Sequence, residues 1–110
     1  MSYKVQSIAV FEKQAKRLIK KYASLKNELF ELVQSLKENP DQGSIIGKNC
    51  YKIRLPIASK GKGKRGGARI VTNFVIADQI VYLLSIYDKS DKENLNDKEL
   101  EELSKKCELG

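Results

Sequence analysis

The spacing of the apolar residues changes from helical to strand-like between residues 38 and 50, and this change constrains the fold more than any other feature. Over residues 9–38 the apolar side chains recur every three or four positions, which is the spacing of amphipathic helices. Over residues 50–87 they follow strand patterns, first alternating with polar residues and then forming a longer apolar run. This change from helical to strand spacing predicts an α+β fold, in which helices pack against a small antiparallel sheet.

The helical part predicts two helices, over residues 9–22 and 24–38, joined as a helical hairpin. The second helix ends at Asn39-Pro40, because a residue that precedes proline is displaced from helical angles. The first helix carries five cations on its outer face, which we interpret as solvated surface, with contact to nucleic acid or to a partner as the alternative. The inward stripes comprise Phe11, Ala15, Leu18, Ile19 and Tyr22, then Leu25, Leu29, Leu32, Val33 and Leu36, and the outer cations are Lys13, Lys16, Arg17, Lys20 and Lys21.

The rest of the chain predicts strands. Residues 3–8 alternate weakly and predict a short strand, whereas residues 41–49 are rich in turn formers and predict a connection. Three further strands are expected to form an antiparallel meander, and the last of them should be interior because it is apolar on both faces. These three strands span residues 50–55, 68–76 and 79–87.

A last helix is expected after the meander. Asn96 and Glu99 have the spacing of a capping box, and Leu95 with Leu100 can form the accompanying hydrophobic staple. Leu100, Leu103 and Cys107 would form the inward stripe of this helix. The predicted element order is therefore β-α-α-β-β-β-α, in one domain over residues 1–110.

The charges are numerous and unevenly placed. The formal net charge is +7 and the isoelectric point is near 9.4, which favours a polyanionic partner. Seven cations and no carboxylate lie between Lys52 and Arg69, whereas seven carboxylates against three lysines lie between Asp88 and Glu102. A surface that serves only solubility mixes its signs. The separation of signs therefore predicts one surface that attracts an anion.

Several classes of site are excluded by the residues present. The chain has no histidine, which excludes a nucleophile paired with histidine and a histidine metal site. The glycines around Gly61 and Gly66 lack the lysine and hydroxyl of a phosphate-binding loop. Cys50 and Cys107 are far apart and are interpreted as small apolar residues. We expect no metal and no cofactor, and, without a long apolar run, no membrane span and a cytoplasmic location.

Two segments carry a resemblance to a known family. The segments NCYKIRLPIASKGKGKRGGARIVTNFV and IVYLLSIYDKS resemble the RelE/ParE superfamily of toxins, most closely the RelE and HigB-like messenger-RNA interferases, and the resemblance runs from Tyr3 to about Lys106. It implies a compact RelE-like fold, similar to that of microbial ribonucleases. It also implies cleavage of translated messenger RNA in the ribosomal A site and neutralisation by an antitoxin encoded beside the toxin.

The resemblance also implies site residues. RelE toxins use lysines and arginines with a tyrosine, and the matching positions here are Lys52, Arg54, Arg69 and Lys89. The tyrosine of the family falls near Leu95, which cannot transfer a proton, and Tyr87 is the candidate substitute. In RNA the 2′-OH is the nucleophile, so converging cations would stabilise the charge that develops on the phosphate.

Roles follow from the chemistry of each side chain. Like charges around Lys52 favour its neutral form, so we expect it to be the general base, with Tyr87 as the alternative. Arg54 and Arg69 would hold the phosphate, since the guanidinium fork fits phosphate oxygens, and Lys89 would assist the phosphate or the leaving oxygen. The cations of the glycine-rich loop would grip the RNA backbone of the ribosome or message. These loop cations are Lys60, Lys62, Lys64 and Arg65.

Two alternative functions stay open on the sequence. One is a ParE-like inhibitor of DNA gyrase, which is not a nuclease. The other is a catalytically impaired member that acts only in binding antitoxin and operator DNA. The expected partners are an acidic, partly disordered antitoxin, the ribosome with its messenger RNA, and operator DNA through the antitoxin complex.

Overall fold

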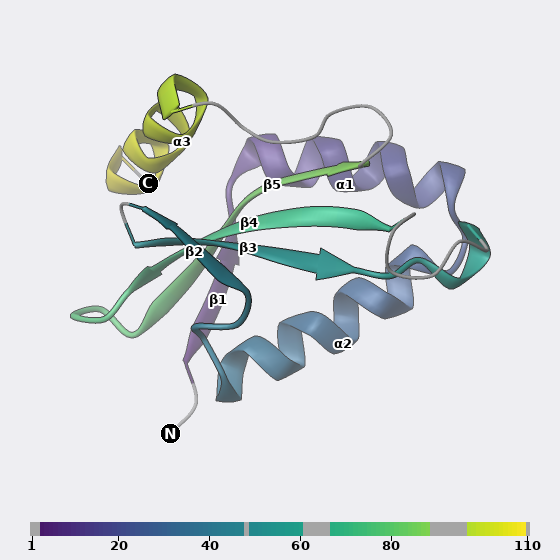
Figure 1. Cartoon of the computed structure of the whole chain (residues 1–110), viewed down its shortest axis with the longest axis horizontal. Coiled ribbons are helices and arrows are strands. Elements are labelled where there is room, and N and C mark those ends of the chain that lie inside the picture. Colours follow the sequence, from purple (N-terminus) through teal and green to yellow (C-terminus); the bar gives the residue numbers. More distant parts are fainter. Residues whose placement is uncertain (1–2, 48, 61–66, 89–96, 110) are drawn as a thin grey trace.

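The computed structural model describes residues 3–47, 49–60, 67–88 and 97–109, and its centre is a five-stranded sheet. The strand order is β1-β5-β4-β3-β2; β1 runs parallel to β5 and the other neighbours are antiparallel. The expected α+β architecture with an antiparallel meander is confirmed (Figure 1). The strands are β1 (Lys4–Ser7), β2 (Ser44–Gly47), β3 (Cys50–Leu55), β4 (Ala68–Val75) and β5 (Ile80–Asp88).

Three helices and one short 3-10 turn complete the described structure. Both helices of the predicted hairpin form, and the last helix follows the sheet as expected. No helix in the described part of the chain has the length and apolar character needed to cross a membrane. The helices are α1 (Ala9–Lys21), α2 (Leu25–Glu38) and α3 (Asp97–Leu109), and the 3-10 turn is η1 (Ala58–Lys60).

One element was missed by the sequence reasoning. The segment predicted as a turn-rich connection contains β2, which pairs with the free edge of β3. All four residues of β2 are exposed, so no alternation of burial marks the strand in the sequence. Gly43 precedes it with φ +93, and a Cβ at this position would collide with the backbone carbonyl of Lys52. The close approach of the two backbones therefore requires glycine there.

The main core lies between the helical hairpin and one face of the sheet. The inward stripes of α1 and α2 pack on β3, β4 and β5, as their spacing predicted, with Leu25, Leu36 and Ile70 fully buried. A smaller cluster lies on the opposite face, where Leu100 and Leu103 of α3 cover one end of the sheet. Figure 1 shows α2 and α3 on opposite sides of the sheet, with α1 alongside β5. Within the described ranges, this arrangement leaves part of the α3 side of the sheet without a helix.

The strand β5 lies between β1 and β4, which confirms its predicted interior position. The register between β4 and β5 shifts after Val71, so that Val71 lies opposite Ser85 whereas Thr72 lies opposite Leu83. Leu84 is therefore an extra residue of a β-bulge, and it packs into the α3 cluster. The bulge reverses which face each later residue of β5 presents, and it sets the side on which Tyr87 lies.

The far end of β5 is fixed by side chains of α1 and of the turn that follows it. Because β1 pairs only with the first half of β5, α1 replaces it along the second half. The Gln14 side-chain oxygen accepts hydrogen bonds from the backbone N–H of Ile86 (3.1 Å) and from the Ser85 hydroxyl (3.0 Å). The Tyr22 hydroxyl donates to the carboxylate of Asp88, which is fully buried (2.7 Å). These hydrogen bonds fix the position of the end of β5, which carries Tyr87.

Candidate functional site

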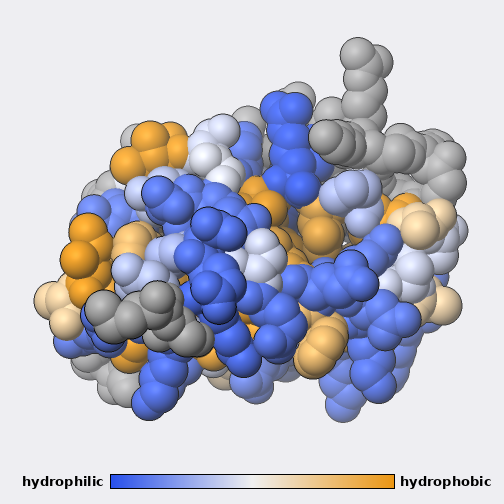
Figure 2. Space-filling view, turned by 90° about the horizontal axis from the view of Figure 1, so that it is seen from below, coloured by the Kyte–Doolittle hydropathy of each residue, from blue (hydrophilic) through white to orange (hydrophobic). Residues whose placement is uncertain are grey.

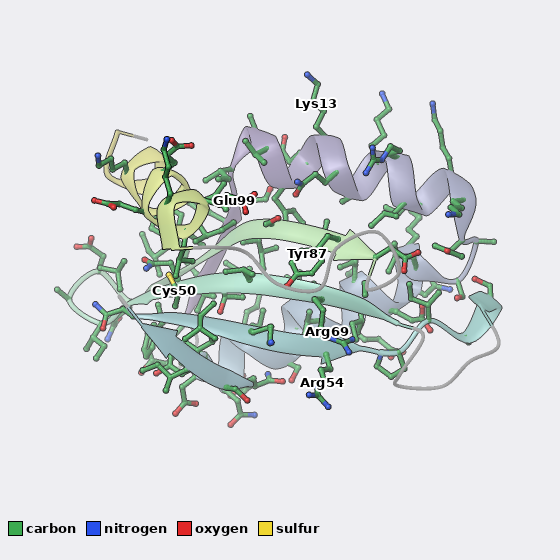
Figure 3. All side chains as sticks on the ribbon, turned by 45° about the horizontal axis from the view of Figure 1, so that its top comes forward. Lys13, Cys50, Arg54, Arg69, Tyr87 and Glu99 are labelled. Carbon is green, nitrogen blue, oxygen red and sulfur yellow. The ribbon has the colours of Figure 1, made fainter. Side chains whose placement is uncertain are left out.

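Three of the predicted site residues form one row across three neighbouring strands. Arg54 of β3 lies directly opposite Arg69 of β4, and Arg69 lies directly opposite Tyr87 of β5. Residues that lie directly opposite each other in an antiparallel pair present their side chains on the same face. Figure 3 shows the three side chains in this sequence from β5 to β3. We call them the Arg–Arg–Tyr row.

The row changes from exposed to buried along its length. Arg54 is exposed, whereas Arg69 has an exposed fraction of only 4% and Tyr87 one of 7%. A guanidinium nitrogen of Arg69, Nη1, donates to the carbonyl oxygen of Ala68 (3.3 Å). Like charges directly opposite each other destabilise a sheet by roughly 0.2–1 kcal/mol. An anion placed against Arg54 and Arg69 would convert this repulsion into attraction.

Lys52 lies on the same face as the row, two residues along β3 from Arg54. It is half-buried and lies opposite Val71 of β4 and Ser44 of β2. Alternate residues of one strand are about 7 Å apart, so Lys52 is within reach of a ligand held by Arg54. The structure thus brings Lys52, Arg54 and Arg69 to one face, in accord with the alternation of the strand residues.

Lys52 and Arg54 also line an open hollow beside the row. Its volume is about 610 Å³, and most of its remaining lining comes from β2 and the residues just before it. This volume lies within the range of about 300–1,000 Å³ that ligand sites occupy. The strand that sequence reasoning missed therefore forms one wall of the hollow next to the two cations. The remaining lining residues are Gln42, Gly43, Ser44, Ile46 and Ile53.

The environment of Tyr87 favours its protonated form. Burial raises the pKa of the Tyr87 phenol above its ordinary value of 10.0, the charge of Arg69 lowers it, and the carboxylate of Glu99 raises it. The net direction is upward, because the phenolate is the form that burial disfavours. With a raised pKa the phenol stays protonated near neutral pH and can donate a hydrogen bond. This direction disfavours Tyr87 as the general base.

Glu99 is a residue near the row that sequence reasoning did not connect with it. The sequence placed Glu99 in a capping box with Asn96, which lies outside the described residues together with Leu95. In the structure Glu99 acts electrostatically on Tyr87, and its neighbour Leu100 packs in the same cluster as Tyr87. Figure 3 places Glu99 on the side of α3 nearer to Tyr87. No pattern in the sequence shows which strand the start of a helix meets.

The other predicted site residues are not placed. Lys89, Lys62, Lys64 and Arg65 lie outside the described residues, as does the side chain of Lys60. The expected inward position of Cys107 also falls on a side chain outside the described set. These assignments stay predictions.

The segment that leads into the glycine-rich loop is nevertheless tied to the start of α2. The backbone N–H of Ala58 donates to the Glu28 carboxylate (2.8 Å). The hydroxyls of Ser24 and Ser59 lie 2.8 Å apart, and the N–H of Ser59 donates to the Ser24 hydroxyl (2.9 Å). The point at which the basic loop leaves the sheet is thus fixed by the helical hairpin.

Comparisons with known proteins agree with the fold. A family model described as the RelE toxin of the RelE/RelB toxin–antitoxin system matches residues 5–109. Free E. coli RelE carrying two arginine-to-alanine substitutions is 19% identical with a TM-score of 0.59, and the match covers 96% of this chain and 97% of that chain. Isolated E. coli RelE is 18% identical with a TM-score of 0.59, covering 94% and 98%.

A third solved structure is the intact E. coli RelBE toxin–antitoxin complex. The match to it has 19% identity and a TM-score of 0.60, and it covers 77% of this chain and 94% of that chain. At these identities the solved structures establish a shared fold, whereas the family model spans almost the whole chain. The chain belongs to the RelE family of toxins of toxin–antitoxin systems.

Proposed function

We propose that this toxin is a ribosome-dependent endoribonuclease, which cleaves translated messenger RNA in the ribosomal A site and thereby inhibits translation in the cytoplasm. The observation that carries the proposal is the direct opposition of Arg54 and Arg69 beside Tyr87. Like charges that lie directly opposite each other on a sheet are destabilising, and a bound anion would relieve this repulsion. A phosphodiester provides that anion, and the guanidinium fork fits its oxygens.

The proposed reaction uses the 2′-OH of the message as nucleophile. Lys52 takes the proton of the 2′-OH as general base, and the 2′-oxygen forms a bond to phosphorus. Arg54 and Arg69 stabilise the additional negative charge on the phosphate oxygens, and we expect this stabilisation to lower the barrier more than any other interaction in the site. The bond from phosphorus to the 5′-oxygen then breaks, and the protonated phenol of Tyr87 supplies the proton that this oxygen needs. The products are a 2′,3′-cyclic phosphate and a free 5′-hydroxyl.

The burial of Arg69 suits a charge that must be in place before the reaction. A guanidinium held in a poorly solvated position by its strand needs little rearrangement when charge develops. Arg54 is exposed and can follow the incoming strand, and Lys89 would assist the phosphate or the leaving oxygen. Arg54 would thus bind the incoming RNA, and the buried Arg69 would mainly stabilise the transition state.

The experiment compares Arg69→Ala with the unchanged protein in a purified translating extract. We expect message cleavage to fall by about 10²-fold or more, because one preorganised group at the developing charge is removed. The matched control is Lys105→Ala, which removes an exposed cation from α3 and should leave cleavage unchanged. Full cleavage by a folded Arg69→Ala variant would overturn the assignment. Inhibition of DNA gyrase without message cleavage would favour the ParE-like function instead.

We also infer that an antitoxin protein is the natural partner. The support is the family and the likeness to the E. coli RelBE complex. An acidic segment that folds on binding would neutralise the exposed cations of this basic chain. Coexpression with the product of the neighbouring gene should yield a complex that no longer cleaves messages in the extract. Cleavage at the same rate in the complex would contradict this partner.

A further inference from the structure

The outer face of α1 carries a regular set of cations that the proposed active site does not use. The positions are three and four residues apart, so the side chains lie along one face of the helix. They span about 10 Å of helix length at 1.5 Å per residue. All of them are exposed, and Figure 3 shows Lys13 pointing away from the sheet. We call them the α1 basic stripe, and they are Lys13, Lys16, Arg17 and Lys20.

This arrangement destabilises the isolated helix. Lys13 and Arg17 are four residues apart, as are Lys16 and Lys20, and each such like-charged pair destabilises the helix. The acid of α1, Glu12, accepts a hydrogen bond from the Ser7 hydroxyl (2.8 Å) at the start of the helix. A bound polyanion would remove the repulsion along the stripe.

The outer face of α2 differs in composition. Its exposed residues include one cation, Lys26, and two acids, Glu31 and Glu38, together with the large apolar side chain of Phe30. Figure 2 shows the α2 side of the molecule, on which hydrophilic and apolar residues are interspersed. A solvated helix face mixes its signs in this manner. The α1 basic stripe, in contrast, consists of cations alone.

The composition of α1 also indicates which kind of partner fits it. The large apolar side chains that are exposed in the described part of the chain are Phe30, Ile45, Ile46 and Ile76, and α1 contributes none of them. A helix that binds a membrane surface inserts apolar side chains, and a protein interface has an apolar or aromatic centre. A nucleic-acid backbone requires neither, because its phosphates are bound by exposed lysines and arginines.

The helix is rigidly connected to the strand that bears Tyr87. Gln14 of α1 bonds Ser85 and Ile86, and Tyr22, which follows α1, bonds Asp88. A structured RNA bound to the stripe is therefore held at a fixed position relative to the Arg–Arg–Tyr row. We propose that the α1 basic stripe binds the phosphate backbone of a double-stranded RNA segment, separate from the single strand cleaved at the row. The inference rests on the proposed function for its biological partner, the ribosomal RNA.

The test compares two variants that each lose four positive charges. The stripe variant is K13Q/K16Q/R17Q/K20Q, and the control variant is K4Q/K26Q/K37Q/K105Q, which removes lysines of β1, α2 and α3. Glutamine removes the charge while keeping a similar helix propensity. The probe is an RNA duplex of about 20 base pairs, somewhat longer than the roughly 16 that a duplex-binding domain spans. Its dissociation constant is measured by fluorescence anisotropy across a potassium chloride series.

We expect the stripe variant to bind the duplex at least about tenfold more weakly than the control at low salt. The magnitude of the slope of log affinity against log salt should fall by about 3.6, since each of the four phosphate contacts contributes about 0.9 in a duplex. Equal losses of duplex affinity in both variants would show that binding depends only on net charge, and this result would overturn the proposal. So would unchanged duplex binding with loss of the antitoxin complex, because the stripe would then bind an acidic protein.

Folding and catalysis are separated from this binding by two further measurements. The stripe variant should melt at a temperature no lower than that of the unchanged protein, because like-charge repulsion is removed. If it fails to fold, the double variants K13Q/R17Q and K16Q/K20Q replace it, and each should lose part of the slope. Arg69→Ala should bind the duplex normally but cleave messages about 10²-fold or more slowly. Normal stripe binding without cleavage by the unchanged protein would overturn the proposed function alone.

Discussion

The two faces of the sheet are built from the same three strands but differ in their chemistry. On the side of the helical hairpin, alternate residues of β3, β4 and β5 are apolar and meet the stripes of α1 and α2. On the other side, the same strands carry Lys52, Arg54, Arg69 and Tyr87, and α3 covers only an apolar cluster at one end. The period of two along a strand permits this division. The apolar face under the helical hairpin stabilises the fold. Repulsion between the cations on the other face destabilises it.

The largest effect on stability is expected on the hairpin side. Leu36 of α2 is fully buried in the main core, and Leu36→Ala should lower the free energy of unfolding by about 2–5 kcal/mol, since it removes apolar contact and leaves a cavity. Denaturant unfolding measures the change. Message cleavage per folded molecule should stay the same, because the substitution lies across the sheet from the row. A parallel loss of intrinsic cleavage would show that the two faces are not independent.

The link between α1 and the end of β5 comes next in magnitude. Tyr22→Phe removes the hydroxyl that donates to the buried carboxylate of Asp88, and a hydrogen bond to a charged group contributes about 1.5–3 kcal/mol. Thermal and denaturant unfolding should both register the loss. Hydrogen exchange at the end of β5 should also accelerate relative to β3. Unaltered exchange there would mean that Tyr22 does not anchor the strand that bears Tyr87.

A substitution in the row on the opposite face should raise the free energy of unfolding rather than lower it. Arg54→Gln removes one of two like charges that lie directly opposite each other, so the free energy of unfolding should rise by roughly 0.2–1 kcal/mol. Cleavage of translated messages should fall in the same variant, because the exposed phosphate ligand is lost. Lys105→Gln, on the exposed side of α3, serves as the control and should change neither quantity. A loss of stability in Arg54→Gln would contradict the interpretation of the row as a repulsive pair.

The smallest effect is a pH dependence that separates Tyr87 from the core. Because the pKa of Tyr87 is raised chiefly by burial, the folded state binds its proton more tightly than the unfolded state. The stability that this contributes is complete below the ordinary value of 10.0 and is lost as the pH rises through the higher pKa of the folded state. The unchanged protein should thus lose more stability above pH 10 than Tyr87→Phe does.

Glu99→Gln gives the matched control for that measurement. It removes a carboxylate that disfavours the phenolate, so the pKa of Tyr87 should move downward. Ultraviolet titration of tyrosinate, with Tyr87→Phe subtracted, follows this single group. No movement in Glu99→Gln would mean that α3 does not bring its carboxylate to the row.

The sequence predicted the elements that have a strong local signal. Both helices of the hairpin, the three strands of the meander and the final helix were expected close to their observed bounds, because their apolar spacing repeats over several turns or alternations. The weaker alternation at residues 3–8 also predicted β1. Alternation also predicted that Lys52 and Arg54 share a face, because successive side chains of a strand point to opposite faces of the sheet. The exposed, four-residue β2 was missed because it carries no pattern of burial.

What only the tertiary structure decided is the register between strands and the packing of helix ends. The opposition of Arg54, Arg69 and Tyr87 depends on long-range pairing and on the bulge at Leu84. Asp88 was grouped by sequence with the acidic C-terminal residues, but the structure buries it beneath Tyr22. The local sequence determined which residues are charged and which way each strand alternates. The contacts between segments far apart in the chain determined which charges meet, because register and burial are properties of the assembled sheet.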